Sequence, residues 1–76
     1  MTLYAFITTE FSAEQRRIMV KLGLMPQRVE RDLEIYAGWL ALQGEKKMEI
    51  YAELAERFKT SESLVREAIK KLAQEI

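Results

Sequence analysis

The residues whose types and spacing could do chemistry lie near the C-terminal end of the chain, between Ser61 and Lys71. If this stretch is a helix, the face opposite its apolar stripe carries Ser63, Arg66, Glu67 and Lys70. An arginine there can donate two hydrogen bonds to guanine, a glutamate can accept one from cytosine, and lysines can hold phosphates. The candidate nucleic-acid contacts are therefore Ser61, Ser63, Arg66, Glu67, Lys70 and Lys71.

An ordinary solvent-exposed helix face is a second interpretation of the same side chains. Glu67 and Lys71 stand four residues apart, and such a pair stabilises a helix by about 0.2–0.5 kcal/mol. The local charge favours the first interpretation, because five basic residues face two acidic ones between Arg57 and Lys71. Bulk attraction to nucleic acid is not expected, because twelve basic and twelve acidic side chains give the chain a formal net charge of zero.

Two amphipathic helices joined by a tight turn would position these residues. We expect the inward side chains to be Met48, Tyr51, Leu54, Ala55 and Phe58 in the first helix and Leu64, Val65, Ala68, Ile69 and Leu72 in the second. Lys59 and Thr60 would form the turn, with Lys59 in the left-handed conformation, which costs a non-glycine residue about 1 kcal/mol. Ser61 is a typical N-cap, so the second helix should begin after it and run to about Glu75.

This segment, over roughly Met48 to Leu72, resembles the helix-turn-helix superfamily. Its end, from Ser61 to Leu72, is similar to the recognition helix of bacterial GntR-type regulators. The Leu54–Phe58 half is similar to many bacterial and phage regulators and to sigma-factor region 4. The resemblance implies a DNA-binding regulator whose second helix enters the major groove.

The chain departs from the pattern of these regulators at its turn and after its last helix. Lys59 stands where the turn usually carries glycine, and Thr60 stands where it usually carries an aliphatic residue. Few residues follow Leu72, so we expect no β-wing of the GntR type. The ligand control of GntR regulators is therefore not implied.

The N-terminal segment Thr2–Thr9 is rich in aromatic and β-branched residues, which favours a β-strand. Such a strand would place Tyr4 and Phe6 on one face, and it would need a partner strand that the rest of the chain does not supply. We therefore expect it to pair with the same strand of a second subunit. The alternative is a helix, because apolar residues recur at four-residue spacing from Leu3 to Phe11.

Two further helices are expected in the middle of the chain. Ser12 and Gln15 form a capping-box pattern that starts the first, and Gly23 should end it. Pro26 suits the first turn of the second. The inward residues of the first helix would be Ile18, Met19 and Leu22.

The helix after Pro26 carries an apolar arc that is too wide for one buried face. We expect one side of the arc to pack on its own domain and the Tyr36–Leu42 side to pack on a second subunit. Gly38 would allow close approach of another backbone or of a ring such as Trp39, and Gly44 should end the helix. The two stripes of the arc are Val29, Leu33, Tyr36 and Leu40, and Ile35, Trp39 and Leu42.

The composition indicates one small domain without metal or covalent cross-links. All 76 residues should form this domain, with a dimerisation region in 1–44 and the helix-turn-helix in 45–76. The chain has no cysteine or histidine, which excludes a disulfide, a structural zinc site and a histidine or cysteine catalytic group. Asp32, the only aspartate, lies in a mixed-charge run where Arg28–Asp32 and Arg31–Glu34 pairs are expected. We therefore expect neither an enzyme nor a cofactor.

The hydropathy pattern points to a protein that does not enter a membrane. No apolar run approaches the length of a membrane span. Glu10 and Glu14 follow the N-terminus too soon for a signal peptide. We therefore expect a cytoplasmic protein.

Two functions are consistent with these features. The first is a small sequence-specific transcriptional regulator that binds double-stranded DNA as a homodimer, on a palindromic site with half-sites about one turn apart. The second is a protein-binding adaptor or inhibitor, for example a phage-type factor that docks on the transcription machinery. The neutral charge and the apolar segments Leu3–Ile7 and Ile35–Leu42 favour the second. Salt-dependent binding to duplex DNA separates the two.

Overall fold

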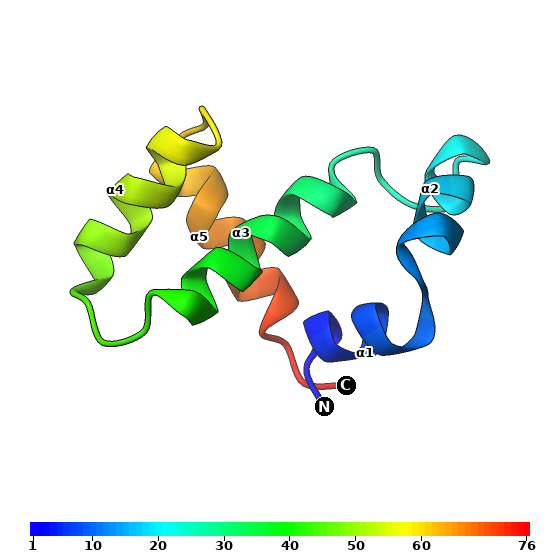
Figure 1. Ribbon diagram of the computed structural model, residues 1–76, viewed down its shortest axis with the longest axis horizontal. Helices are drawn as coiled ribbons and strands as arrows, with labels where there is room; N and C mark the ends of the chain where they lie inside the picture. Colours follow the sequence, from blue (N-terminus) through cyan, green and yellow to red (C-terminus); the bar gives the residue numbers. More distant parts are fainter.

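Five α-helices account for 68% of the chain, and the computed structural model describes residues 1–76. In chain order they are α1 (Leu3–Glu10), α2 (Ala13–Lys21), α3 (Val29–Ala41), α4 (Lys47–Arg57) and α5 (Glu62–Leu72) (Figure 1). The expected mainly α fold is confirmed. None of these helices combines the length and the apolar character that crossing a membrane requires.

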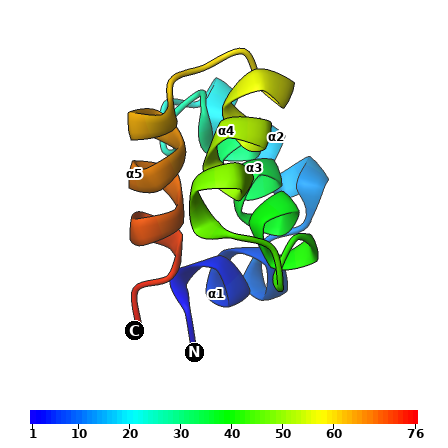
Figure 2. The ribbon, with the colours of Figure 1, turned by 90° about the vertical axis from the view of Figure 1, so that its left-hand side faces the viewer.

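The core lies between α3, α4 and α5, which pack on one another (Figures 1 and 2). Every buried residue is apolar and belongs to one of these three helices. Removing this apolar surface from water, at roughly 25 cal/mol per Å², is the main force that holds the three helices together. The buried residues are Val29, Leu33, Ile35, Tyr36, Ile50, Leu54, Ala55, Val65, Ala68, Ile69 and Leu72.

The prediction of a strand over Thr2–Thr9 is wrong, because this segment forms helix α1. Oγ1 of Thr2 caps the helix by accepting a hydrogen bond from the amide of Ala5 at 3.1 Å. α1 packs on α5, and the ring of Tyr4 lies 4.6 Å from the ring of Tyr36 on α3. A helix satisfies its backbone hydrogen bonds internally, whereas a lone strand in this chain would lack a partner.

α2 begins where the capping box predicts and stops at the expected glycine. The hydroxyl of Ser12 accepts from the amide of Gln15 at 3.1 Å, and Oε1 of Gln15 accepts from the amide of Ser12 at 2.8 Å. Gly23 follows with a φ of +79°, which is the left-handed region. The prediction that Ile18 and Leu22 face inward is wrong, because their exposed fractions are 51% and 66%.

An ion pair to α3 holds α2 in place, together with Val20, which packs against the core. Nε of Arg16 lies 2.6 Å from Oε1 of Glu30, and Nη1 of Arg16 donates to the carbonyl of Phe11 at 2.7 Å. The side chain of Arg16 is only 12% exposed. Because Arg16 points inward, residues on the opposite side of the helix, such as Ile18, point to solvent.

Most of the apolar arc of α3 is covered within the chain, although Leu40 is 45% exposed. Tyr36 is 5% exposed and lies between the rings of Tyr4 and Trp39, at centroid distances of 4.6 Å and 5.4 Å. The prediction that Tyr36 faces a second subunit is therefore wrong. Pro26 was expected in the first turn of the helix. The helix begins at Val29, so Pro26 lies in the turn that precedes it.

Gly38 lets α3 and α4 approach each other closely, as expected. A Cβ at this position would lie 2.8 Å from Cδ2 of Leu54, whose side chain is fully buried. The neighbour is therefore a leucine side chain of α4 and not a backbone or the Trp39 ring. On α4 itself, Met48 was expected to face inward but is 64% exposed. Ile50 takes the inward position instead, because it lies one turn before Leu54.

Candidate nucleic-acid interface

A tight turn over residues 58–61 connects α4 to α5. Lys59 has a φ of +52°, so the expected left-handed conformation is confirmed. The amide of Lys59 donates to the carbonyl of Glu56 at 3.2 Å, and the amide of Thr60 donates to the carbonyl of Ala55 at 2.9 Å. This pair of bonds is the Schellman arrangement at a helix C-terminus. It ends α4 abruptly and sets the direction in which the chain enters α5.

Ser61 caps the N-terminus of α5, as expected. Its hydroxyl oxygen accepts a hydrogen bond from the amide of Leu64 at 3.2 Å. The cap uses one lone pair of this oxygen, so the hydroxyl proton is still free to be donated to an external partner. α5 ends at Leu72 and not near Glu75, because the residues that follow hydrogen-bond to the start of α1.

The outer face of α5 carries three exposed candidate residues, Ser63, Glu67 and Lys70. None of the ion pairs or side-chain hydrogen bonds of the chain involves them. On the other side of the helix, Leu64 was expected to face inward but is 36% exposed, because it lies at the edge toward α3. The remaining predicted inward residues are buried, namely Val65, Ala68, Ile69 and Leu72.

Arg66 lies on the side of α5 that faces α4. Its guanidinium is 5.4 Å from the ring centroid of Tyr51, and its Nη2 is 3.9 Å from Oε1 of Glu62. The Arg66 side chain is 51% exposed, so both contacts are weak surface contacts. They hold the guanidinium near the outer face without removing it from solvent. Arg66 is therefore partly ordered and still free to donate to a ligand.

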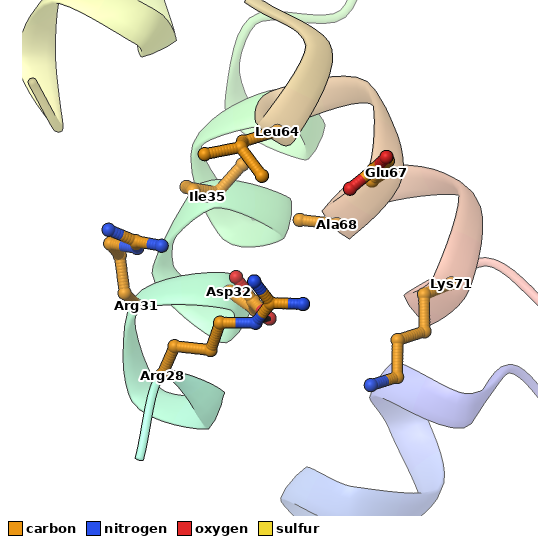
Figure 3. A pocket seen from close by; sticks show the side chains of 8 residues that line it. All are labelled: Arg28, Arg31, Asp32, Ile35, Leu64, Glu67, Ala68 and Lys71. Atoms are coloured by element: carbon orange, nitrogen blue, oxygen red, sulfur yellow. Dashed lines mark ion pairs between the residues drawn. The ribbon is translucent and has the colours of Figure 1, made fainter. Parts of the chain in front are cut away.

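A groove of about 250 Å³ separates α5 from the N-terminal half of α3. In Figure 3, basic and acidic side chains from the two helices surround this space, with Leu64, Ile35 and Ala68 on its apolar side. The groove places Lys71 and Glu67 of α5 opposite α3. The residues that line it are Arg28, Arg31, Asp32, Ile35, Leu64, Glu67, Ala68 and Lys71.

The charges around this groove are only partly paired. Nε of Arg28 is 3.9 Å from Oδ2 of Asp32, so that expected pair is present but long. The Glu67–Lys71 pair, which belonged to the alternative interpretation of an ordinary exposed face, does not form. Nε of Arg31 is buried without a hydrogen-bond partner. The net formal charge of the groove is positive, because three basic side chains face two acidic ones.

Arg28 and Arg31 are the members of this site that sequence reasoning missed. Both were assigned to ion pairs within their own helix, and the expected Arg31–Glu34 pair is absent. Their spacing of three residues on one helix face is the signal that could have found them. Together with Lys71 they can hold an anionic group, while Glu67 and Asp32 limit how much negative charge the groove accepts.

Comparison of this chain with protein-family models, with curated proteins and with solved structures finds no match.

Proposed function

We propose that this protein is a DNA-binding transcriptional regulator that uses α4 and α5 as a helix-turn-helix and acts as a homodimer in the cytoplasm. The observation that carries the proposal is the outer face of α5. There, exposed polar and basic side chains stand on a helix whose start is held by the Lys59 turn and the Ser61 cap. A helix presented in this way can enter a major groove of DNA.

The packing of α5 supports this use. The helix contacts both α3 and α4, and it buries Val65, Ala68, Ile69 and Leu72 along its length. A helix that reads base edges must keep its outer side chains in one register, and packing against two neighbours provides the necessary rigidity. The three-helix core therefore serves as the scaffold of the proposed interface.

Each candidate residue has a distinct role in this proposal. Arg66 donates two hydrogen bonds to guanine, and Glu67 accepts one from cytosine. Ser63 lies near the start of α5 and contacts a base edge or a phosphate of the DNA. The Ser61 hydroxyl donates a hydrogen bond to a phosphate of the DNA backbone. The Lys70 and Lys71 side chains hold phosphates of the two DNA strands that border the major groove.

Arg28 and Arg31 extend the proposed interface from α5 onto α3. They line the same groove as Lys71, so a phosphate bound in that groove would lie among side chains from both helices (Figure 3). The basic surface therefore includes side chains from two helices.

A selection of bound sequences from a random pool of DNA duplexes tests the proposal, followed by fluorescence anisotropy at several salt concentrations. Arg66→Ala should cost about 1–3 kcal/mol of specific binding and relax the preference at one base pair. Lys70→Ala should weaken binding to all sequences alike and reduce the salt slope by about one unit. Both variants should fold, because both side chains are exposed.

Val65→Asp is the control for loss of the fold. Val65 is fully buried, so an unpaired carboxylate there should unfold the domain and abolish all binding. Circular dichroism distinguishes this outcome from the specific loss expected for Arg66→Ala. A wild-type protein without salt-dependent affinity for any duplex would contradict the proposed function.

A second candidate function is a protein-binding adaptor or inhibitor, for example one that docks on the transcription machinery. Ile18, Leu22 and Leu24 favour it, because these large apolar side chains are between 51% and 68% exposed outside the core. Exposed apolar groups of this kind are common at protein interfaces. This function predicts binding to a protein that depends on these three residues, together with no affinity for duplex DNA.

A further inference from the structure

The exposed side of α2 is apolar at its centre and charged on either side. Glu14, Ile18, Lys21 and Leu22 recur at helical spacing, and all four are exposed. The exposed fraction is 51% for Ile18 and 66% for Leu22, and it is 68% for Leu24 in the turn that follows. These five residues are called the α2 face.

Contacts on the opposite side of α2 determine where the α2 face points. Arg16 is held by Glu30 and by the carbonyl of Phe11, and Val20 packs against the core. The α2 face therefore points away from the three-helix core. Figure 1 shows α2 at the end of the molecule opposite α4. No residue of α2 is buried, so the α2 face remains available to a partner.

Two α2 helices laid antiparallel would match each other in charge. Ile18 is at the centre of the α2 face, with Glu14 one turn before it and Lys21 one turn after it. A twofold axis near Ile18 places the turn that carries Glu14 in one copy beside the turn that carries Lys21 in the other. Ile18 then contacts its own symmetry mate, and Leu22 extends the apolar contact at each end.

We propose that a second copy of this chain docks on the α2 face, with the two α2 helices antiparallel about a twofold axis. A twofold contact needs a surface that is complementary to itself, and the order acidic, apolar, basic along α2 meets this need. This dimer rests on the homodimer of the proposed function, and the α2 face is the surface through which its two copies would bind. It replaces the expected interface at Tyr36, which α1 covers.

The size of the α2 face sets the expected strength of this contact. α2 has nine residues and is therefore about 13 Å long. A stable interface of standard size buries about 800 Å² on each partner, which is more than one short helix and one turn supply. The dimer should therefore dissociate on dilution, and its measured mass should depend on concentration.

Sedimentation equilibrium of the full chain over a range of concentrations tests the proposal. Ile18→Asp should raise the dimer Kd by more than about tenfold, because a charge replaces the central apolar contact in both copies. Glu14→Lys and Lys21→Glu should each raise it about threefold to tenfold, because like charges then meet twice across the axis. A protein with both charge changes should regain a Kd close to that of the wild type, because the exchanged charges attract again.

Met48→Asp is the matched control, because Met48 is 64% exposed on α4 and lies outside the α2 face. It should leave the dimer Kd unchanged, and circular dichroism should show the same helix content in every variant. The proposal is overturned if the wild type stays monomeric, if Ile18→Asp dimerises like the wild type, or if the double charge variant dimerises no better than either single one.

The DNA-binding assay on the same samples separates this proposal from the proposed function. Wild-type dimers that bind no duplex would contradict DNA binding and leave the α2 face as the dimer surface. Monomers that bind duplex DNA would overturn the dimer surface and leave DNA binding in place.

Discussion

Lys59 adopts the left-handed conformation although it carries a Cβ, which costs about 1 kcal/mol relative to glycine. Lys59→Gly should therefore raise the free energy of unfolding by up to about 1 kcal/mol. Lys59→Ala is the matched control, because it removes the charge and keeps the strain. Urea unfolding followed by circular dichroism measures both. A glycine variant that is less stable than the alanine variant would contradict the strain at this position.

The turn and the cap could be predicted because they are closed by atoms a few residues apart. The Ser61 hydroxyl bonds to the amide of Leu64, and the Thr60 amide bonds to the carbonyl of Ala55. The orientation of the Arg66 side chain could not be predicted in this way, because its contact with Tyr51 joins two helices. The sequence places Arg66 on the outer side of α5 but does not show which neighbour orients its guanidinium.

α1 shows, at the scale of one helix, how tertiary packing overrides residue composition. Aromatic and β-branched residues in Thr2–Thr9 favour a strand, yet the segment is helical. The Thr2 cap starts the helix, and the apolar surface that Tyr36 offers on α3 gives one face of it a place to pack. The helical spacing from Leu3 to Phe11 was the correct signal, because the chain offers no partner strand for this segment.

Tyr4 and Phe6 provide a test of this helix, because a strand would place them on the same face and a helix separates them. Tyr4→Ala should lower the free energy of unfolding by about 1–3 kcal/mol, because its ring packs on Tyr36 at 4.6 Å. Phe6→Ala should cost less, because Phe6 is 37% exposed. Thermal or urea unfolding measures the difference. Equal losses for the two variants would contradict the helical assignment of this segment.

At the scale of the whole molecule, the failed predictions concern surfaces that distant segments build together. The mainly α fold and the three helices of the core follow from local apolar periodicity. Tyr36 appeared to need a second subunit because nothing in the sequence shows that α1 folds back over it. The groove that joins Arg28 and Arg31 to Lys71 was missed for the same reason, since it forms only when α3 packs on α5.

The balanced charge of the whole chain makes the salt dependence of DNA binding informative. The formal net charge is zero, so attraction to DNA must come from local basic side chains on α3 and α5. The logarithm of the binding constant falls with the logarithm of the salt concentration by about 0.9 for each phosphate that is neutralised. If all four phosphate candidates make their contacts, the slope should approach about −3.6 per copy. The four are Arg28, Arg31, Lys70 and Lys71.

Arg28→Gln tests whether α3 belongs to this interface. The Arg28 side chain is 57% exposed, so the change should preserve the fold. It should reduce the magnitude of the salt slope by about 0.9, because one phosphate contact is lost. Arg57→Gln is the matched control, because Arg57 pairs with Glu53 at 3.6 Å on α4, away from the groove, and its loss should leave the slope unchanged. An unchanged slope for Arg28→Gln, with DNA binding intact, would confine the interface to α5.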